Sequence, residues 1–185
     1  MRFKLLFFPV NILLLILFSS ELYSQKELDS LSVGYIDSLK VKDSINDFSN
    51  REFIDGIISY SKKFLGVPYE YAGTSPVGFD CSGFIYYVFG NFGFSITRTS
   101  YSMAEFGETI MLSQVRAGDL LFFKGRSLKS TSIAHVALVV SHDDDGIKMI
   151  HSSSSRGVVI DNFSRSKYFI PRFLKAKRLD YGVED

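Results

Sequence analysis

The spacing of apolar residues predicts two helices in the first part of the folded region. Residues 51–66 place apolar side chains near helical spacing, and the run ends at Gly66, just ahead of Pro68. Asn50 stands immediately before this run and is the expected N-cap. A second helical pattern covers residues 81–93 and stops at its final glycine. The segment between the two helices is rich in Gly and Pro, which indicates turns.

After residue 115 the hydrophobic pattern changes to short β-type runs. Five runs are separated by turns, with the sequences GDLLFF, AHVALVV, IKMIHS, GVVIDN and RFLKAKRL. The segment SHDDDGI is typical of a hairpin connection in which Gly146 supplies the turn. Helices followed by strands favour an α+β fold, in which an antiparallel sheet of about five strands packs against the helix that begins at Cys81.

The first 24 residues have the three-part pattern of a secretory signal. Arg2 and Lys4 precede an apolar run from Leu5 to Phe18, and small polar residues follow. We therefore expect an exported protein that works in the periplasm or outside the cell. A membrane span needs about 20 apolar residues. This run is shorter, so membrane attachment is expected only if the segment is retained as an anchor.

The rest of the chain divides into a polar stretch and one domain. Residues 25–50 are rich in Ser and Asp, which indicates a linker or a loose helical arm. Residues 51–180 hold the predicted helices and strands and form the expected domain. The whole chain has 21 Lys and Arg against 20 Asp and Glu, a net charge of +1. This balance leaves no basic stripe of the kind that binds nucleic acid.

Cys81 is the single cysteine of the chain and lies at the start of a predicted helix. A thiol there faces unpaired backbone N–H groups and the positive end of the helix dipole, and both stabilise the thiolate. A lone cysteine is more often a small buried apolar residue. In an oxidising compartment, however, an unpaired thiol is a liability, which favours a chemical role. We therefore expect Cys81 to be a nucleophile.

The three histidines are candidates for the base that such a thiol requires. If residues 135–141 and 147–151 form one hairpin, His135 and His151 are neighbours on adjacent strands, and His142 lies at the turn end as a solvated residue. A thiol, a base and a third polar group then form a triad. A zinc site is the rival use of these residues. Their separation lacks the short spacing of metal clusters, so no metal is expected.

These motifs together resemble the NlpC/P60 family of cell-wall cysteine peptidases. The matching segments are GVPYEYAGTSPVGFDCSGFIYYVF, ITRTSYSM, RAGDLLFF, AHVALVV and MIHSSSSRGVVI, and the resemblance covers roughly residues 52–178. It implies a papain-like fold. The chain departs from common family patterns at Ala72, where many members have Gly, and at Thr97, where many have Pro. These departures leave the choice of substrate open, but they do not remove a residue that the reaction requires.

The resemblance implies roles for seven residues. Cys81 matches the nucleophile, His135 the general base, His151 the residue that orients the base, and Tyr69 a donor to the oxyanion; the positions that match peptide contacts are Asp80, Ser82 and Ser100. Some of these residues have structural alternatives: Tyr69 as a core aromatic, Asp80 as a helix N-cap and Ser82 as part of the helix start.

The implied activity is hydrolysis of peptidoglycan stem peptides or muropeptides at the bond between D-γ-glutamate and the diamino acid. No cofactor is expected, because the thiol and the imidazole carry the chemistry. Two alternatives stay open. One is a non-catalytic wall-binding module on the same fold, and the other is an acyltransferase or amidase of related fold.

Overall fold

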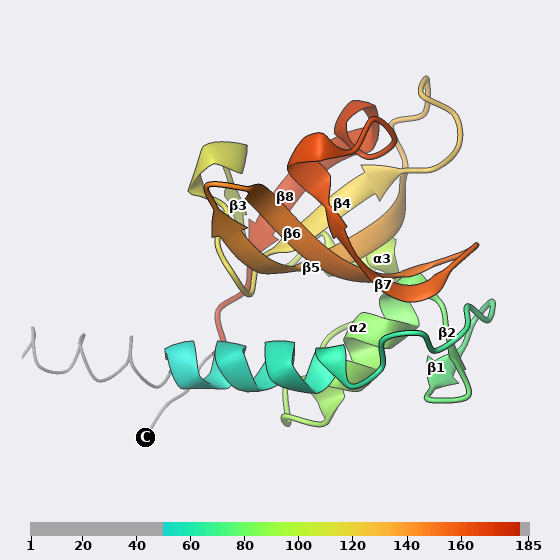
Figure 1. The fold of residues 1–185 in the computed structure, drawn as a ribbon, viewed down its shortest axis with the longest axis vertical. Helices are drawn as coiled ribbons and strands as arrows, with labels where there is room; N and C mark the ends of the chain where they lie inside the picture. The colour runs from blue at the N-terminus through green and yellow to red at the C-terminus, as the bar shows by residue number, and fades with distance from the viewer. Residues whose placement is uncertain (1–49, 182–185) are drawn as a thin grey trace, which may run out of the picture. The chain divides into compact units, whose positions relative to one another are not determined.

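The helices of the protein lie on one side of an antiparallel sheet (Figure 1). The computed structural model describes residues 50–181, so the predictions for residues 1–24 and for nearly all of 25–50 lie outside it. Residues 50–62 are helical. Asn50 is itself part of this helix, and its side-chain oxygen has no hydrogen-bond partner, so the N-cap expected there was wrong. No helix within residues 50–181 is long and apolar enough to cross a membrane.

The second helix, α2 (Cys81–Gly90), begins at the predicted residue. Its regular hydrogen bonding ends at Gly90, and the turn that follows closes at Gly93, which has a φ of +74°. The Phe94 N–H donates to the Phe89 carbonyl at 3.1 Å, and the Gly93 N–H donates to the Gly90 carbonyl at 3.1 Å. This pair of bonds is a Schellman motif, which explains why the helical pattern stops at that glycine. A further short helix, α3 (Ser100–Met103), was not predicted.

The main sheet has six strands in the order β3-β8-β4-β5-β6-β7, and all neighbouring pairs are antiparallel. Five of them are the predicted runs: β4 (Leu120–Lys124), β5 (Ile133–Asp143), β6 (Gly146–Ser153), β7 (Gly157–Asn162) and β8 (Phe173–Arg178). The sixth is β3 (Glu108–Ile110), a largely exposed edge strand too short to show alternation. Two further strands, β1 (Thr74–Ser75) and β2 (Gly78–Phe79), form a separate pair. The expected α+β fold is confirmed.

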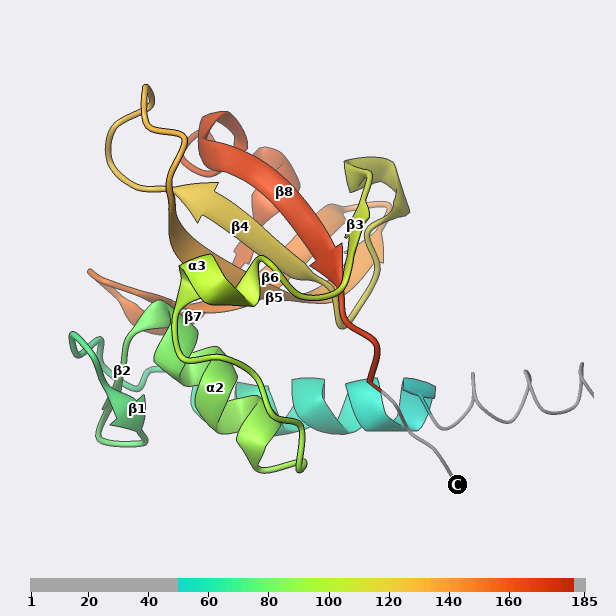
Figure 2. The same ribbon diagram turned by 180° about the vertical axis from the view of Figure 1, so that it is seen from behind.

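The sheet is buried on both faces, as strand β4 shows. Leu120 and Phe122 belong to the core between the sheet and the helices, while Leu121 and Phe123 belong to a second core on the opposite face. The second core also includes residues from the segment between β7 and β8. That segment contains two 3₁₀ turns, η2 (Phe163–Arg165) and η3 (Ile170–Arg172); a third turn, η1 (Leu112–Gln114), precedes β4 (Figures 1 and 2).

Two close approaches between backbone segments position the parts of the chain that carry Cys81 and Tyr69. A β-carbon on Gly83 would lie 2.0 Å from the Gly73 carbonyl oxygen, so only glycine lets α2 pack against the backbone just before β1. Gly157 has a φ of +69°, and a β-carbon there would lie 2.2 Å from the Val67 carbonyl oxygen. This contact lets the N–H of Val158 donate to the Val67 carbonyl at 2.9 Å. The segment that carries Tyr69 is thereby joined directly to β7.

Candidate active site

Cys81 is the first residue of α2, and its side chain is mostly buried, with 9% exposed. Asp80 is the N-cap, and its Oδ1 accepts from the Gly83 N–H at 2.6 Å. Strand β6 is tied to the same segment, because the buried Ser152 hydroxyl donates to the Phe79 carbonyl at 2.7 Å. The start of α2 is therefore held by both the helix cap and the sheet.

The position of Cys81 does not by itself favour a thiolate. Burial is the largest influence and raises the thiol pKa, and the negative charge of Asp80 raises it further. Backbone N–H groups, among them those of Val136 and Ser82, lower it without reversing the shift. The expected stabilising influence of backbone N–H groups is present, but burial and the capping carboxylate outweigh it. The resting thiol is protonated and needs a base.

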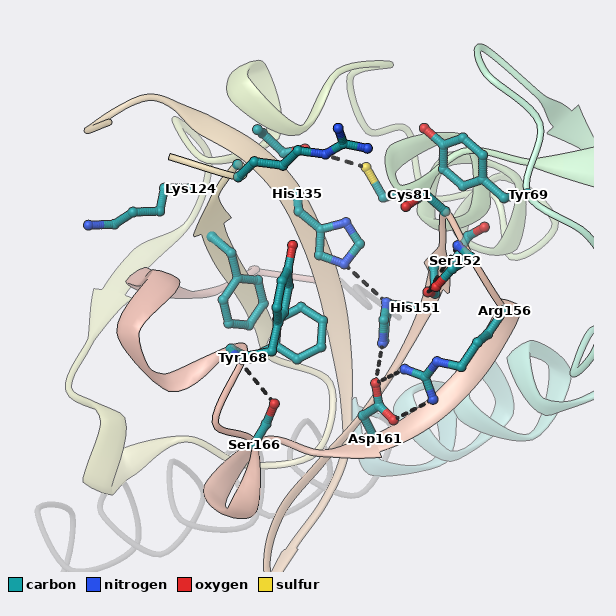
Figure 3. Close-up of a pocket in the computed structure, with 18 of the residues that line it drawn as sticks. Tyr69, Cys81, Lys124, His135, His151, Ser152, Arg156, Asp161, Ser166 and Tyr168 are labelled. Atoms are coloured by element: carbon teal, nitrogen blue, oxygen red, sulfur yellow. Dashed lines mark hydrogen bonds and ion pairs between the residues drawn. The ribbon is translucent and has the colours of Figure 1, made fainter. Parts of the chain in front are cut away.

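Two histidines meet on adjacent strands beside the cysteine (Figure 3). Strands β5 and β6 pair with Leu138 opposite Ile150, so His135 and His151 are diagonal neighbours on one face. The distance from His135 Nε2 to His151 Nδ1 is 3.1 Å, and the two rings are perpendicular. The predicted hairpin and the proximity of these two residues are confirmed.

His142 lies at the far end of the same hairpin. It belongs to β5 rather than to the turn, which Asp144 and Asp145 form, and Gly146 with a φ of +108° follows them. The His142 Nδ1 is 2.7 Å from the Val115 carbonyl oxygen. His142 is exposed, as expected, but it is tied to the backbone rather than freely solvated.

The imidazole of His135 lies against aromatic side chains. Phe169 stacks on it with ring centroids 5.8 Å apart, and Phe123 packs beside it at 6.0 Å. Burial is the main cause that lowers the His135 pKa, and His151 lowers it further, while Asp161 acts in the opposite direction. A neutral imidazole is what a general base requires, and here it faces a protonated thiol.

The hydrogen bond between His135 and His151 is the start of a series, the polar chain, which continues to two residues that the sequence did not indicate. Asp161 on β7 places its Oδ2 at 3.0 Å from His151 Nε2. Arg156, from the turn between β6 and β7, donates to Oδ1 at 3.0 Å and to Oδ2 at 2.5 Å of the same carboxylate. The hydrogen bond from His151 is the largest influence that lowers the Asp161 pKa, and Arg156 lowers it as well. Asp161 is therefore a carboxylate at neutral pH.

A cavity of about 570 Å³ opens beside Cys81, and Figure 3 shows the polar chain within it. Tyr69 lines this cavity and is half-buried, with its phenol near the sulfur of Cys81 and across from His135. This position does not match the core-aromatic alternative. Besides those already named, the lining includes side chains of the β4–β5 and β6–β7 connections and of the segment before η3: Lys124, Arg126, Ser153, Ser154, Ser155, Ser166 and Tyr168.

The three residues expected to contact substrate do not line this cavity. Asp80 forms two hydrogen bonds with Arg98, at 3.0 and 2.7 Å, and the same guanidinium donates to the Ser82 hydroxyl at 3.0 Å. Ser100 is the half-buried first residue of α3. Asp80 and Ser82 thus form a polar cluster with Arg98 on the helix side of the cysteine, in addition to the cap that Asp80 provides.

The part of the chain described here contains no group of three or more His, Cys, Asp and Glu side chains placed to hold a metal ion. The ring nitrogens of His135 and His151 instead bond to each other and to a carboxylate. The zinc alternative therefore finds no ligand set within residues 50–181.

The family model described as the NlpC/P60 family matches residues 66–178, more than half of the chain. The chain belongs to the NlpC/P60 family. A crystal structure of an NlpC/P60 family protein from Bacillus cereus ATCC 10987 has a TM-score of 0.60 and 36% identity, covering 68% of this chain and 39% of that chain. The α+β architecture is thus shared with another NlpC/P60 domain.

Two similar proteins come from Bacillus subtilis (strain 168). One is a γ-DL-glutamyl hydrolase, 36% identical over 124 residues, which cover 66% of this chain and 29% of the relative. The other is a γ-D-glutamyl-L-lysine dipeptidyl-peptidase, 44% identical over 98 residues, which cover 53% of this chain and 31% of the relative. The chain therefore spans about a third or less of these relatives.

Proposed function

We propose that the protein is a cysteine endopeptidase that hydrolyses peptidoglycan stem peptides at the bond between D-γ-glutamate and the diamino acid. The observation that carries this proposal is the convergence of Cys81, His135 and His151 on one cavity. The two Bacillus subtilis relatives support the choice of bond, since both are named for action on a γ-glutamyl linkage. The partner is a stem peptide or a muropeptide.

In the proposed mechanism, the Cys81 thiol gives its proton to the imidazole of His135 as the sulfur attacks the γ-glutamyl carbonyl carbon. The carbonyl oxygen becomes an oxyanion, which the Tyr69 hydroxyl and backbone N–H groups at the start of α2 stabilise. Collapse breaks the C–N bond, and the imidazolium gives its proton to the leaving amine. A thioester remains on Cys81.

Water completes the cycle in the same cavity. His135 takes a proton from the attacking water, the C–S bond breaks, and the proton returns to the sulfur. His151 orients His135 throughout by accepting a hydrogen bond from its Nε2–H. Asp80, Ser82 and Ser100 are proposed to contact the substrate on the helix side of the cysteine, and Arg98 bonds with the first two of these.

Export is a separate part of the proposal. We place the protein in the periplasm or outside the cell, at the cell wall, because residues 1–24 have the pattern of a secretory signal and the proposed substrate lies there. Residues 25–50 would then link this segment to a peptidase domain at 51–180. N-terminal sequencing of the protein recovered from the cell envelope or the medium tests the cleavage; a protein that begins at Met1 would contradict it.

The test of activity is incubation of the purified protein with a defined tripeptide of L-Ala, γ-D-Glu and the diamino acid, followed by mass spectrometry. We expect L-Ala-γ-D-Glu and the free diamino acid, and no product from Cys81→Ala, whose folding is checked by circular dichroism. Binding without products would indicate the wall-binding alternative. A product joined to an added amine would indicate the acyltransferase. A muropeptide is incubated in parallel, and cleavage of its bond to the sugar would indicate the amidase. A γ-linked glutamyl polymer is the comparison substrate.

A further inference from the structure

We propose that Asp161, held by Arg156, is a positioning residue that fixes the tautomer of His151 and, through it, the tautomer of His135. The inference rests on the proposed function, because it concerns how the thiol of Cys81 loses its proton. Neither residue touches the reacting atoms, so the effect of both passes through His151.

The carboxylate determines which nitrogen of His151 carries the proton. Asp161 Oδ2 lies 3.0 Å from His151 Nε2, and His151 is almost completely buried, with 1% exposed. A carboxylate accepts hydrogen bonds and cannot donate them. Arg156 binds both of its oxygens and favours the charged form. The His151 Nε2 therefore carries the proton, and its Nδ1 holds a lone pair.

This tautomer sets the next one along the chain. The lone pair on His151 Nδ1 faces His135 Nε2 at 3.1 Å, so the Nε2 of His135 must be the donor. A neutral imidazole has one N–H, which leaves a lone pair on Nδ1 of His135. Figure 3 shows this second ring nitrogen directed toward the side of the cavity where the sulfur of Cys81 lies. The base is thus ready to accept the thiol proton.

The opposite tautomer would disable the base. If His151 carried its proton on Nδ1, His135 would have to accept at Nε2 and would carry its own proton on Nδ1. That nitrogen could not take a proton from the sulfur. A histidine in the third place of the triad can adopt either tautomer, so it needs a partner that selects one. Asp161 provides that selection.

Within residues 50–181, the ring nitrogens of these two histidines have no other hydrogen-bond partner than each other and Asp161. The other charged or titratable side chains that line the cavity are Tyr69, Cys81, Lys124, Arg126, Arg156 and Tyr168. Arg156 is paired with Asp161. The described contacts therefore leave Asp161 as the group that sets the direction of the hydrogen bonds between His151 and His135.

The decisive variant is Asp161→Asn, which keeps the size of the side chain. The carbonyl oxygen of the new amide would face Arg156, and its NH₂ would donate toward His151 Nε2, which selects the disabling tautomer. The corresponding change in the Ser-His-Asp triad costs about 10⁴-fold through the wrong tautomer. We expect the kcat/KM for the tripeptide to fall by at least about a hundredfold at neutral pH. Activity should recover at alkaline pH, where the thiol ionises without the base.

A second readout does not require the substrate. The alkylation rate of Cys81 by iodoacetamide follows the thiolate fraction. In Asp161→Asn its pH profile should move toward higher pH, because proton transfer to His135 is disfavoured. If the wild type cleaves no tripeptide, the proposed function fails, but the alkylation profiles still test the positioning role.

Two controls separate positioning from structure. Asp145→Asn alters another Asp–Arg pair, the one between Asp145 and Arg165, and neither of these residues lines the cavity. It should leave the pH profiles of activity and of alkylation unchanged. In a His151→Ala background, Asp161→Asn should have no further effect, because its route to His135 is gone. A loss that is equal at every pH, or one that adds in full to that of His151→Ala, would overturn the proposal. Unfolding midpoints verify that each variant is folded.

Discussion

Two aspartate–arginine pairs flank Cys81, and they differ in what else the carboxylate binds. Asp80 bonds to Arg98 at 2.7 and 3.0 Å, and Asp161 bonds to Arg156 at 2.5 and 3.0 Å. In both pairs the arginine is the more exposed partner.

The third partner of each carboxylate decides its effect. Asp80 accepts from the backbone N–H of Gly83, whereas Asp161 lies at hydrogen-bonding distance from His151. The first pair therefore caps the start of a helix, and in our proposal the second fixes the place of a proton. Similar pairs on the two sides of one sulfur thus differ in whether the carboxylate binds a backbone N–H or an imidazole.

The largest expected effect is on the strand side of the cysteine. His135→Ala should lower kcat by about 10²–10⁴-fold, because no other group can take the thiol proton. The free energy of unfolding should also fall, because the ring packs against Phe123 and Phe169 and bonds to the buried His151, so kcat is measured under conditions where the variant is folded. Steady-state kinetics and urea unfolding measure the two quantities.

His142→Ala is the matched control for this substitution. It should keep nearly full activity and lose about 1 kcal/mol of stability with the hydrogen bond to the Val115 carbonyl. If His142→Ala lowers the rate as much as His135→Ala does, the division of roles between the two histidines is wrong.

Tyr69→Phe sharpens the comparison, because we propose that the Tyr69 hydroxyl stabilises the oxyanion. If its hydroxyl supports the oxyanion, kcat should fall by about 10²–10³-fold while folding and KM stay close to the wild type. Tyr71→Phe is the control: Tyr71 is 87% exposed and should tolerate the change. A decrease of less than about threefold would leave the backbone N–H groups of α2 as the oxyanion donors.

Substitution of Asp80 should separate its charge from its cap. Asp80→Ala removes the N-cap and should cost about 1 kcal/mol in the free energy of unfolding. Asp80→Asn keeps a capping side chain but removes the charge that raises the pKa of Cys81. Alkylation of Cys81 in Asp80→Asn should therefore shift to lower pH. An unchanged alkylation profile would show that the capping carboxylate does not act on the thiol.

The smallest expected effect is the pH dependence of the free energy of unfolding that His135 causes. Burial, and then His151, lowers the His135 pKa below its ordinary value of about 6.5. Below that value the unfolded chain binds more protons than the folded one, so stability is lost as pH falls through the window toward the folded pKa. Asp161, whose pKa is also below its usual range, loses its stabilising contribution only below about pH 5, so it adds little slope between pH 7 and pH 5.

We expect the free energy of unfolding of the wild type to decrease between pH 7 and pH 5, which denaturant titrations at the two values measure. His135→Gln should reduce this decrease. An identical slope in the variant would assign the pH dependence to other groups.

The sequence predicted most of the fold because long elements carry a strong pattern. The helix start at Cys81 and strands β4 to β8 followed from periodicity and turn residues. Strand β3 was missed, since three residues with one buried side chain cannot show alternation. The end of α2 was placed at Gly93, and the glycine does close the Schellman motif there.

The site was predicted in its residue types but not in its electrostatics. The proximity of His135 and His151 followed from a hairpin with a clear turn. Asp161 was missed because its place beside His151 depends on the β6–β7 register, which the turn at residues 154–156 sets and composition does not reveal. The sequence indicated the backbone N–H groups that lower the thiol pKa, but not the opposing burial, which arises only from packing.

The hydrogen bond between Val158 and Val67 has a consequence for the order of folding. The thiol and its base come from segments that are far apart in sequence, and closing such long loops is slow. A chain in which β7 has not yet docked on residues 66–68 already has the thiol at a helix start. In the proposed mechanism, such a chain still lacks the hydrogen-bonded route from Asp161 through His151 to His135, so a nascent or partly folded molecule would remain inactive until this backbone contact closes.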